Sequence, residues 1–164
     1  MILDFYFRKP VLLDYLIAIL ITVLLFILYK NNLFNLPTTQ DSYDLTGDLT
    51  NISLTMAGFI LTILTVLITF KDTSNNKPTT EVNSTFNNFF STDFYYETVK
   101  HLKNCIKSIV FIATIGFFIK LFFGLDYRKF FFFYNAFGLV IIVLTIWRCL
   151  IILSKILILQ KEDK

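Results

Sequence analysis

The sequence predicts an all-α integral membrane protein with four transmembrane helices. Hydrophobic residues make up 55% of the 164 positions, and Phe alone occurs 20 times. Such a composition, arranged in long apolar runs, is typical of membrane proteins and rare in soluble domains of this size. Four apolar segments, separated by polar or charged ones, are each long enough to cross a hydrocarbon core of about 30 Å.

The first two spans have recognisable starts. One covers about residues 11–29 and follows Pro10, a residue that suits the first turn of a helix. The other covers about residues 52–70. Thr46 and Asp48 offer side-chain oxygens for helix capping ahead of this second span. We therefore expect its helix to begin before the membrane.

The last two spans form a hairpin. The third covers about residues 106–123 and the fourth about 130–147, and the connection between them is short. A short connection favours antiparallel neighbours. Apolar residues continue past the fourth span, so we expect a cytoplasmic helical tail over 148–164.

The segment between the second and third spans, residues 71–104, is the one sizeable soluble element. It is rich in aromatic residues, and Asp93 can cap a helix that leads from it into the third span. Aromatic side chains beside a membrane entry either anchor in the headgroup layer or bind a partner. The candidate docking residues for a soluble cytoplasmic protein are Phe86, Phe90, Phe94 and, on the tail, Lys155.

Basic residues predict the orientation. With the N-terminus inside, eleven Lys and Arg lie on the inner side of the membrane and four on the outer side. The excess of positive charge in short loops marks the cytoplasmic side. Both termini are therefore expected in the cytoplasm of a bacterial cell, with the chain in the cytoplasmic (inner) membrane.

The second span carries one polar stripe. Its residues recur in steps of three and four, a spacing that places them on one face of a helix. Between Leu54 and Phe70 no other residue is polar. The stripe consists of Asp48, Asn51, Thr55, Gly58, Thr62, Thr65, Thr69 and Asp72.

The stripe has two main interpretations. Small and hydroxyl residues let helices approach closely in lipid, so the stripe can be a helix–helix seam, either between copies or against the chain's own helices. Ala113 and Gly116 of the third span offer one such partner within the chain. The alternative is a pore wall, because acidic rings at pore mouths favour cations. We favour a seam in a homo-oligomer, with Thr62 and Thr65 as the residues that test conduction.

Two charged residues lie inside the predicted spans near their inner ends. Asp14 is one turn into the first span, and Arg148 lies at a similar depth in the fourth. A charge at membrane depth is costly and usually finds a partner. We predict an ion pair of Asp14 with Arg148, and the alternative is that each reaches water separately.

The residue pattern gives little support for a catalytic or metal site. The two Cys and one His stand in no metal-ligand or redox motif, and no Ser/His/Asp set, paired intramembrane carboxylate or phosphate loop is present. The basic residues form no groove-lining run, so no direct nucleic-acid binding is expected. We therefore expect no enzyme, cofactor or metal. A small transporter is a weaker alternative, because Asp14 lies too near the membrane edge.

The stretch from Leu54 to Thr65, LTMAGFILTILT, resembles one found in small bacterial four-span proteins. Some of these are membrane components of anti-phage systems, such as the membrane subunit of the Kiwa system and the membrane accessories of RNA-targeting CRISPR loci. The resemblance covers these twelve residues and the four-span layout. It implies an oligomeric membrane effector or sensor in defence that works with a soluble cytoplasmic partner. A non-conducting scaffold subunit is the alternative.

Overall fold

A computed structural model describes residues 9–75, 89–90, 92–123 and 127–162. The long helices are α2 (Pro10–Lys30), α3 (Thr39–Asn75), α5 (Asp93–Phe122) and α6 (Arg128–Glu162). All four are long and apolar enough to cross a membrane. Over the described residues this confirms the prediction of a helical protein with four helices long and apolar enough to span a membrane.

Helix α3 begins earlier than the predicted caps. Thr38 and Asp41 form a reciprocal capping arrangement, in which the backbone N–H of Asp41 donates to Thr38 Oγ1 at 3.1 Å and the backbone N–H of Thr38 donates to the Asp41 carboxylate at 3.3 Å. Thr46 and Asp48 therefore lie in the helix interior and do not cap it. With 37 residues, α3 is about 55 Å long and exceeds the roughly 30 Å of a hydrocarbon core.

The other helix ends follow the sequence more closely. Helix α5 starts at Asp93 and runs without a break into the third span. Thr92 holds the cap position, so the prediction of Asp93 as the cap is off by one residue. Helix α6 continues past Arg148 to Glu162 as one helix, so the expected tail extends the fourth span.

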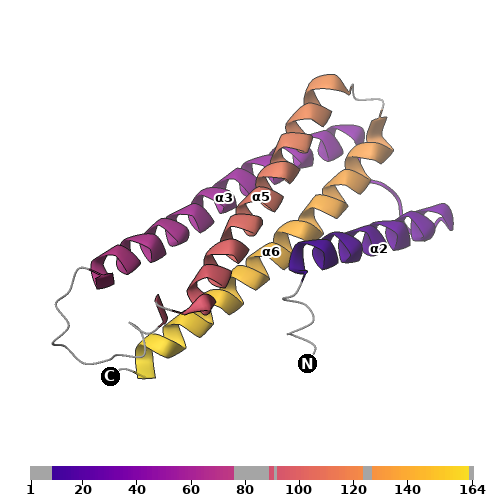
Figure 1. The fold of residues 1–164 in the computed structure, drawn as a ribbon. Helices are drawn as coiled ribbons and strands as arrows, with labels where there is room; N and C mark the ends of the chain where they lie inside the picture. The colour runs from indigo at the N-terminus through magenta and orange to yellow at the C-terminus, as the bar shows by residue number, and fades with distance from the viewer. Residues whose placement is uncertain (1–8, 76–88, 91, 124–126, 163–164) are drawn as a thin grey trace.

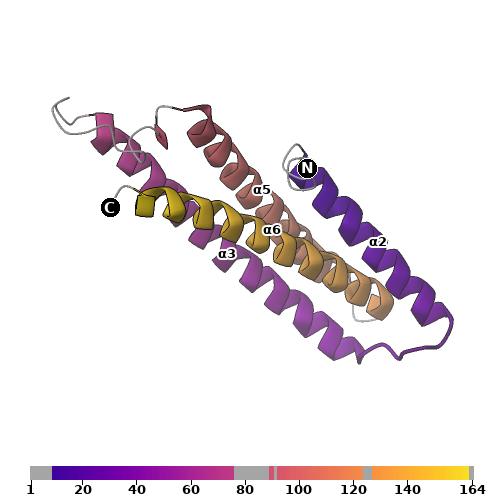
Figure 2. The same ribbon diagram turned by 90° about the horizontal axis from the view of Figure 1, so that it is seen from below.

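Helices α3, α5 and α6 pack against one another, whereas α2 lies on the side of the bundle (Figure 1). Helix α2 contacts α6 and, to a smaller extent, α5. Within the described residues it makes no contact with α3, although the chain leads directly from one to the other (Figure 2). One face of α3 is thus left without a helical neighbour.

The apolar core divides into two clusters along the bundle. The first lies towards the C-terminal ends of α3 and α6 and includes the segment 89–90. The second lies towards the opposite end, where α2, α5 and the first half of α6 meet around Phe131 and Ile141. Between them lies the buried charge pair described below.

Helices α3 and α5 pack so that the polar segment of each lies beside the apolar segment of the other. Thr50 lies against Gly116, and the Lys71 ammonium donates to the Tyr96 hydroxyl at 2.9 Å near the other end. The polar beginning of α3 therefore packs beside the apolar end of α5. The apolar stretch 52–70 packs beside the charged beginning of α5, and buried polar groups in α3 consequently need partners within the bundle.

Gly116 should be required for this packing. An added Cβ there would meet Thr50 Oγ1 and would lie 2.9 Å from the Tyr134 hydroxyl, so Gly116→Ala should destabilise the protomer by about 1–3 kcal/mol. Thr114→Ala is the control, because Thr114 is exposed on the same helix and lies outside the stripe. Thermal unfolding in detergent, followed by circular dichroism, should show a lower midpoint for Gly116→Ala only. Equal midpoints for the two variants would contradict the α3–α5 contact.

Candidate functional site

The structure brings Asp14 and Arg148 together in the interior of the bundle. Arg148 Nη1 of α6 lies 2.8 Å from Asp14 Oδ2 of α2. Both residues are 0% exposed, so neither side chain reaches water at the surface. An unpaired ion at this position would lose its hydration without compensation, which accounts for the pairing.

A third helix joins this pair through Cys105. Arg148 Nε donates a hydrogen bond to Cys105 Sγ of α5 at 3.3 Å. Cys149, the other cysteine, is also buried, and both are free. Arg148 thus links α2, α5 and α6 at one level of the bundle.

This link matters most for α2. Few of its side chains are buried, and in its apolar window only 11% of the residues are buried within the protomer. The buried residues of α2 are Pro10, Asp14 and Ala18. The ion pair therefore contributes a buried, specific attachment of α2 to α6 and, through Cys105, to α5. Ring contacts of Tyr15, Phe26 and Tyr29 with Phe137 and Phe133 of α6 add to it.

A second polar network lies where α3 meets the beginning of α6. Thr46 Oγ1 donates to Asn135 Oδ1 at 2.9 Å, and Asn135 Nδ2 donates to the backbone carbonyl of Ser42 at 2.8 Å. All three residues are buried. Thr50 and Ser53 continue the same buried face one and two turns on, with hydroxyls bonded to carbonyls of their own helix. Our reading of the sequence missed this network, although Ser42, Thr46, Thr50 and Ser53 show the same steps of four and three as the stripe.

The predicted stripe lies on the opposite side of α3, facing away from the protomer. All eight of its residues, from Asp48 to Asp72, are exposed. Nothing lies within 4 Å of a Cβ built on Gly58. The alternative in which the stripe packs within the chain against Ala113 and Gly116 is wrong. Gly116 does contact α3, but through the buried face that carries Thr50.

The threonine hydroxyls of the stripe bond to their own helix. Thr55, Thr62, Thr65 and Thr69 each donate to the carbonyl four residues earlier, at 2.9–3.0 Å. Such bonds leave no donor unsatisfied, so these threonines can face an apolar environment as small side chains. Asp48 and Asn51 lie on the same exposed face.

The predicted docking residues differ in their exposure. Phe90 is only 4% exposed and belongs to the first core cluster, with its ring centroid 5.2 Å from that of Phe89 and 5.6 Å from that of Tyr95. It is therefore a core residue in this structure and is not presented to a partner. Phe94 and Lys155 are exposed. Phe86 lies outside the described residues.

Comparisons with known proteins give no family for this chain. No protein-family model, no curated protein and no solved structure matches it.

Within the described part of the chain, no group of three or more His, Cys, Asp or Glu residues could hold a metal ion.

The buried pair should show strong coupling in a double-mutant cycle. Arg148→Met leaves Asp14 buried without its partner, and Asp14→Leu does the same to Arg148. Each single change should cost about 3–5 kcal/mol, whereas the double variant, which removes both charges, should recover most of that stability. The measurement is thermal unfolding in detergent. Additive losses in the double variant would show that the two side chains do not depend on each other.

Proposed function

We propose that this chain is a non-enzymatic membrane subunit that assembles with copies of itself along the exposed stripe of α3. The assembly acts as a membrane effector or sensor. The observation that carries this proposal is the exposure of the whole stripe, including Asp48 and Asn51, on a helix that is apolar enough to span a membrane.

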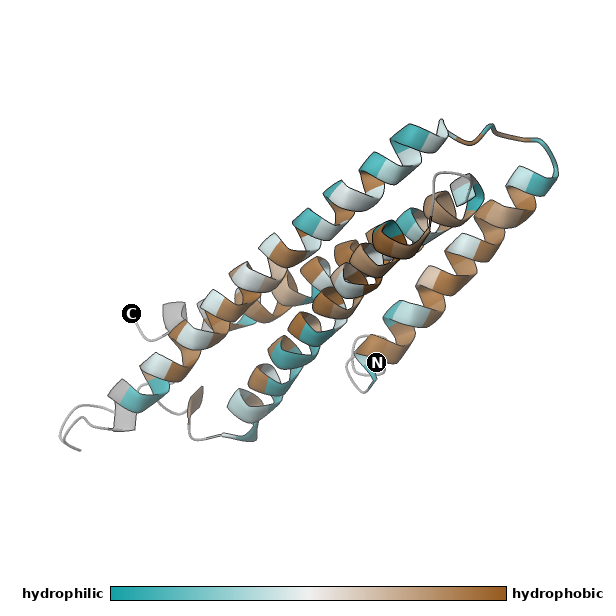
Figure 3. Ribbon diagram, turned by 90° about the horizontal axis from the view of Figure 1, so that it is seen from above, coloured by the Kyte–Doolittle hydropathy of each residue, from teal (hydrophilic) through white to brown (hydrophobic). Residues whose placement is uncertain are grey.

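The depth of Asp48 and Asn51 follows from contacts with α6. Asp14 of α2 lies against Arg148, and Thr46 of α3 lies against Asn135, about 20 Å farther along α6. Helix α3 runs in the same direction as α6, and α2 runs in the opposite direction (Figure 1). Asp48 and Asn51 are therefore level with the second half of α2, which is apolar along most of its length (Figure 3).

Lipid is an unfavourable neighbour for this face. An Asp inside a membrane helix is unfavourable, by about 2.5–3.5 kcal/mol on insertion scales at the centre of the helix and by less towards its ends, and such residues usually face protein or a water-filled space. Within the described residues, no helix of the same protomer covers the stripe. A cover supplied by another chain would remove that cost.

The residues beside the stripe favour a second copy as this cover. Both flanks of the stripe carry apolar side chains at intervals of seven residues, and all of them are more than 40% exposed. One flank consists of Ile52, Phe59 and Val66, and the other of Leu54, Leu61 and Ile68. A seam of small residues bordered by apolar ones at a heptad spacing suits parallel helices with a left-handed crossing. Copies of one chain inserted in the same direction present such parallel helices.

The setting of this assembly follows from the sequence. The excess of Lys and Arg at the two termini and in the segment 71–104 supports a bacterial inner-membrane protein with both termini in the cytoplasm. The likeness of LTMAGFILTILT to components of anti-phage systems supports a role in defence. A soluble cytoplasmic partner would then meet the exposed residues Phe94 and Lys155.

Cysteine cross-linking tests the assembly directly. Thr55→Cys and Thr62→Cys, one heptad apart on the stripe, should each form covalent dimers when membranes are treated with an oxidant. Thr114→Cys is the matched control, because Thr114 is also exposed and also bonds to its own helix, but on α5. The native cysteines are buried at 0% and 5% exposure and should not react. Dimers at all three positions, or at none, would count against a specific α3 seam.

Conduction is the second candidate function, because exposed Asp48 and Asp72 stand at the two ends of the stripe. It predicts that activated cells depolarise, as measured with a membrane-potential dye. Replacing Thr62 and Thr65 by Leu should abolish the depolarisation, and Thr114→Leu should leave it unchanged. Depolarisation that survives the double replacement would exclude a path along α3 while leaving the assembly to be judged by cross-linking.

A further inference from the structure

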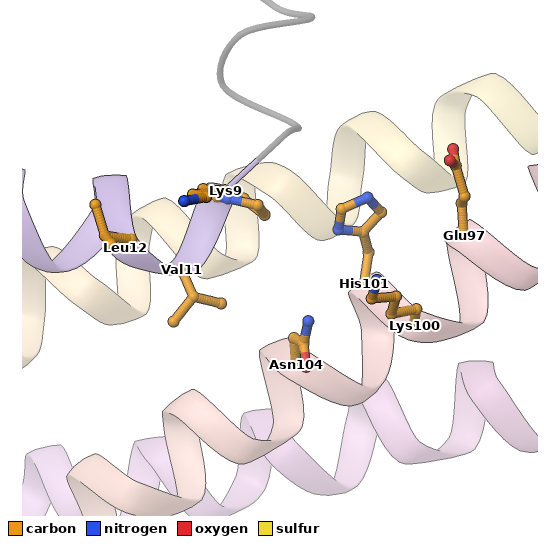
Figure 4. Close-up of a pocket in the computed structure, with 8 residues that line it drawn as sticks. Lys9, Val11, Leu12, Glu97, Lys100, His101 and Asn104 are labelled. Atoms are coloured by element: carbon orange, nitrogen blue, oxygen red, sulfur yellow. The ribbon is translucent and has the colours of Figure 1, made fainter.

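A cleft opens between the beginning of α2 and the first turns of α5. Its volume is about 460 Å³. The α5 side is formed by Glu97, Lys100, His101 and Asn104, and the α2 side by the four consecutive residues 9–12 (Figure 4). The cleft has no part in the stripe of α3, which lies on the other side of the bundle.

The charges of the lining favour an anion. Lys9 and Lys100 contribute two positive charges against the single carboxylate of Glu97. Glu97 lies one turn before His101 in α5, on the side of His101 that faces away from α2 (Figure 4). His101 and Asn104, both half-buried, add polar side chains to the lining. The arrangement offers charge-assisted hydrogen bonds to an oxyanion.

The start of α2 adds to this preference. Helix α2 begins at Pro10, and Lys9 at its cap position makes no side-chain capping bond. Its first turn carries no acidic residue. The N-terminal end of a helix carries a partial positive charge that attracts anions, and here it borders a cleft that already holds two lysines.

The remaining wall and the depth of the cleft point to lipid. Val11 and Leu12 line the cleft with apolar surface, and Leu12 is 54% exposed. Leu16, one turn further along α2, is 52% exposed and extends this apolar surface away from the cleft. Lys9 lies two residues before the first apolar span, and Asn104 lies two residues before the third. Two independent spans therefore place the cleft where headgroups meet acyl chains.

We infer that this cleft binds the phosphate group of an anionic phospholipid. Lys9, Lys100 and His101 hold the phosphate, and an acyl chain follows the apolar side of α2. A soluble phosphate would use the same polar groups but gain nothing from Val11 and Leu12. This inference goes beyond the proposed assembly and depends only on the placement of the helices in a membrane.

Native mass spectrometry of the full chain in detergent tests this site, with phosphatidylglycerol, phosphatidylcholine or inorganic phosphate added. The wild-type chain should retain one phosphatidylglycerol under conditions where phosphatidylcholine is lost. Lys100→Gln should weaken phosphatidylglycerol binding about fivefold, and the double change with Lys9→Gln about twentyfold or more. Lys103→Gln is the matched control, because Lys103 is exposed on the same helix and does not line the cleft.

Each outcome has a defined meaning. Weaker binding in the cleft variants with unchanged binding in Lys103→Gln supports the site. An equal loss in Lys103→Gln would show attraction by net charge alone and overturn it. Equal retention of phosphatidylcholine would also overturn it. If inorganic phosphate protects the chain against thermal unfolding as well as the lipid does, the cleft belongs to a soluble anion and the lipid assignment fails.

Discussion

Helix α3 carries polar side chains on two opposite faces, and a single protomer covers only one of them. The covered face packs against α5 and α6, with Thr46 bonded to Asn135 and Thr50 lying against Gly116. This packing fixes the register of the bundle and turns the stripe outwards. The exposure of Asp48 and Asn51 therefore follows from the hydrogen bonds and packing contacts of the opposite, buried face of α3.

The buried charges hold the remaining helix in place. Helix α2 has few buried side chains, and Arg148 connects it through Asp14 to α5 and α6. A buried pair of this kind contributes specificity of position more than net stability, because the desolvation of both ions offsets much of their attraction. The same arrangement positions the start of α2 beside α5 and so creates the basic cleft. The interior thus determines both surfaces to which we assign functions.

The sequence was sufficient for the helices and for one pair of residues, but not for the packing. Apolar run length gives four spans directly, and a charge such as Asp14 inside a span requires a partner at similar depth. The outward direction of the stripe could not be predicted, because Thr46 and Thr50 form an equally regular polar face and spacing does not say which face is buried. Phe90 shows the same difficulty, since an aromatic side chain suits a core, a headgroup layer or a partner equally well.

The assembly of copies is the central claim, because it gives the polar face of α3 a neighbour other than lipid. The most direct measurement is the native mass of the wild-type protein released from its membrane in a mild detergent. We predict a defined multiple of the 19.2 kDa chain mass. A single species at 19.2 kDa, at protein concentrations where the fold is intact, would contradict the account.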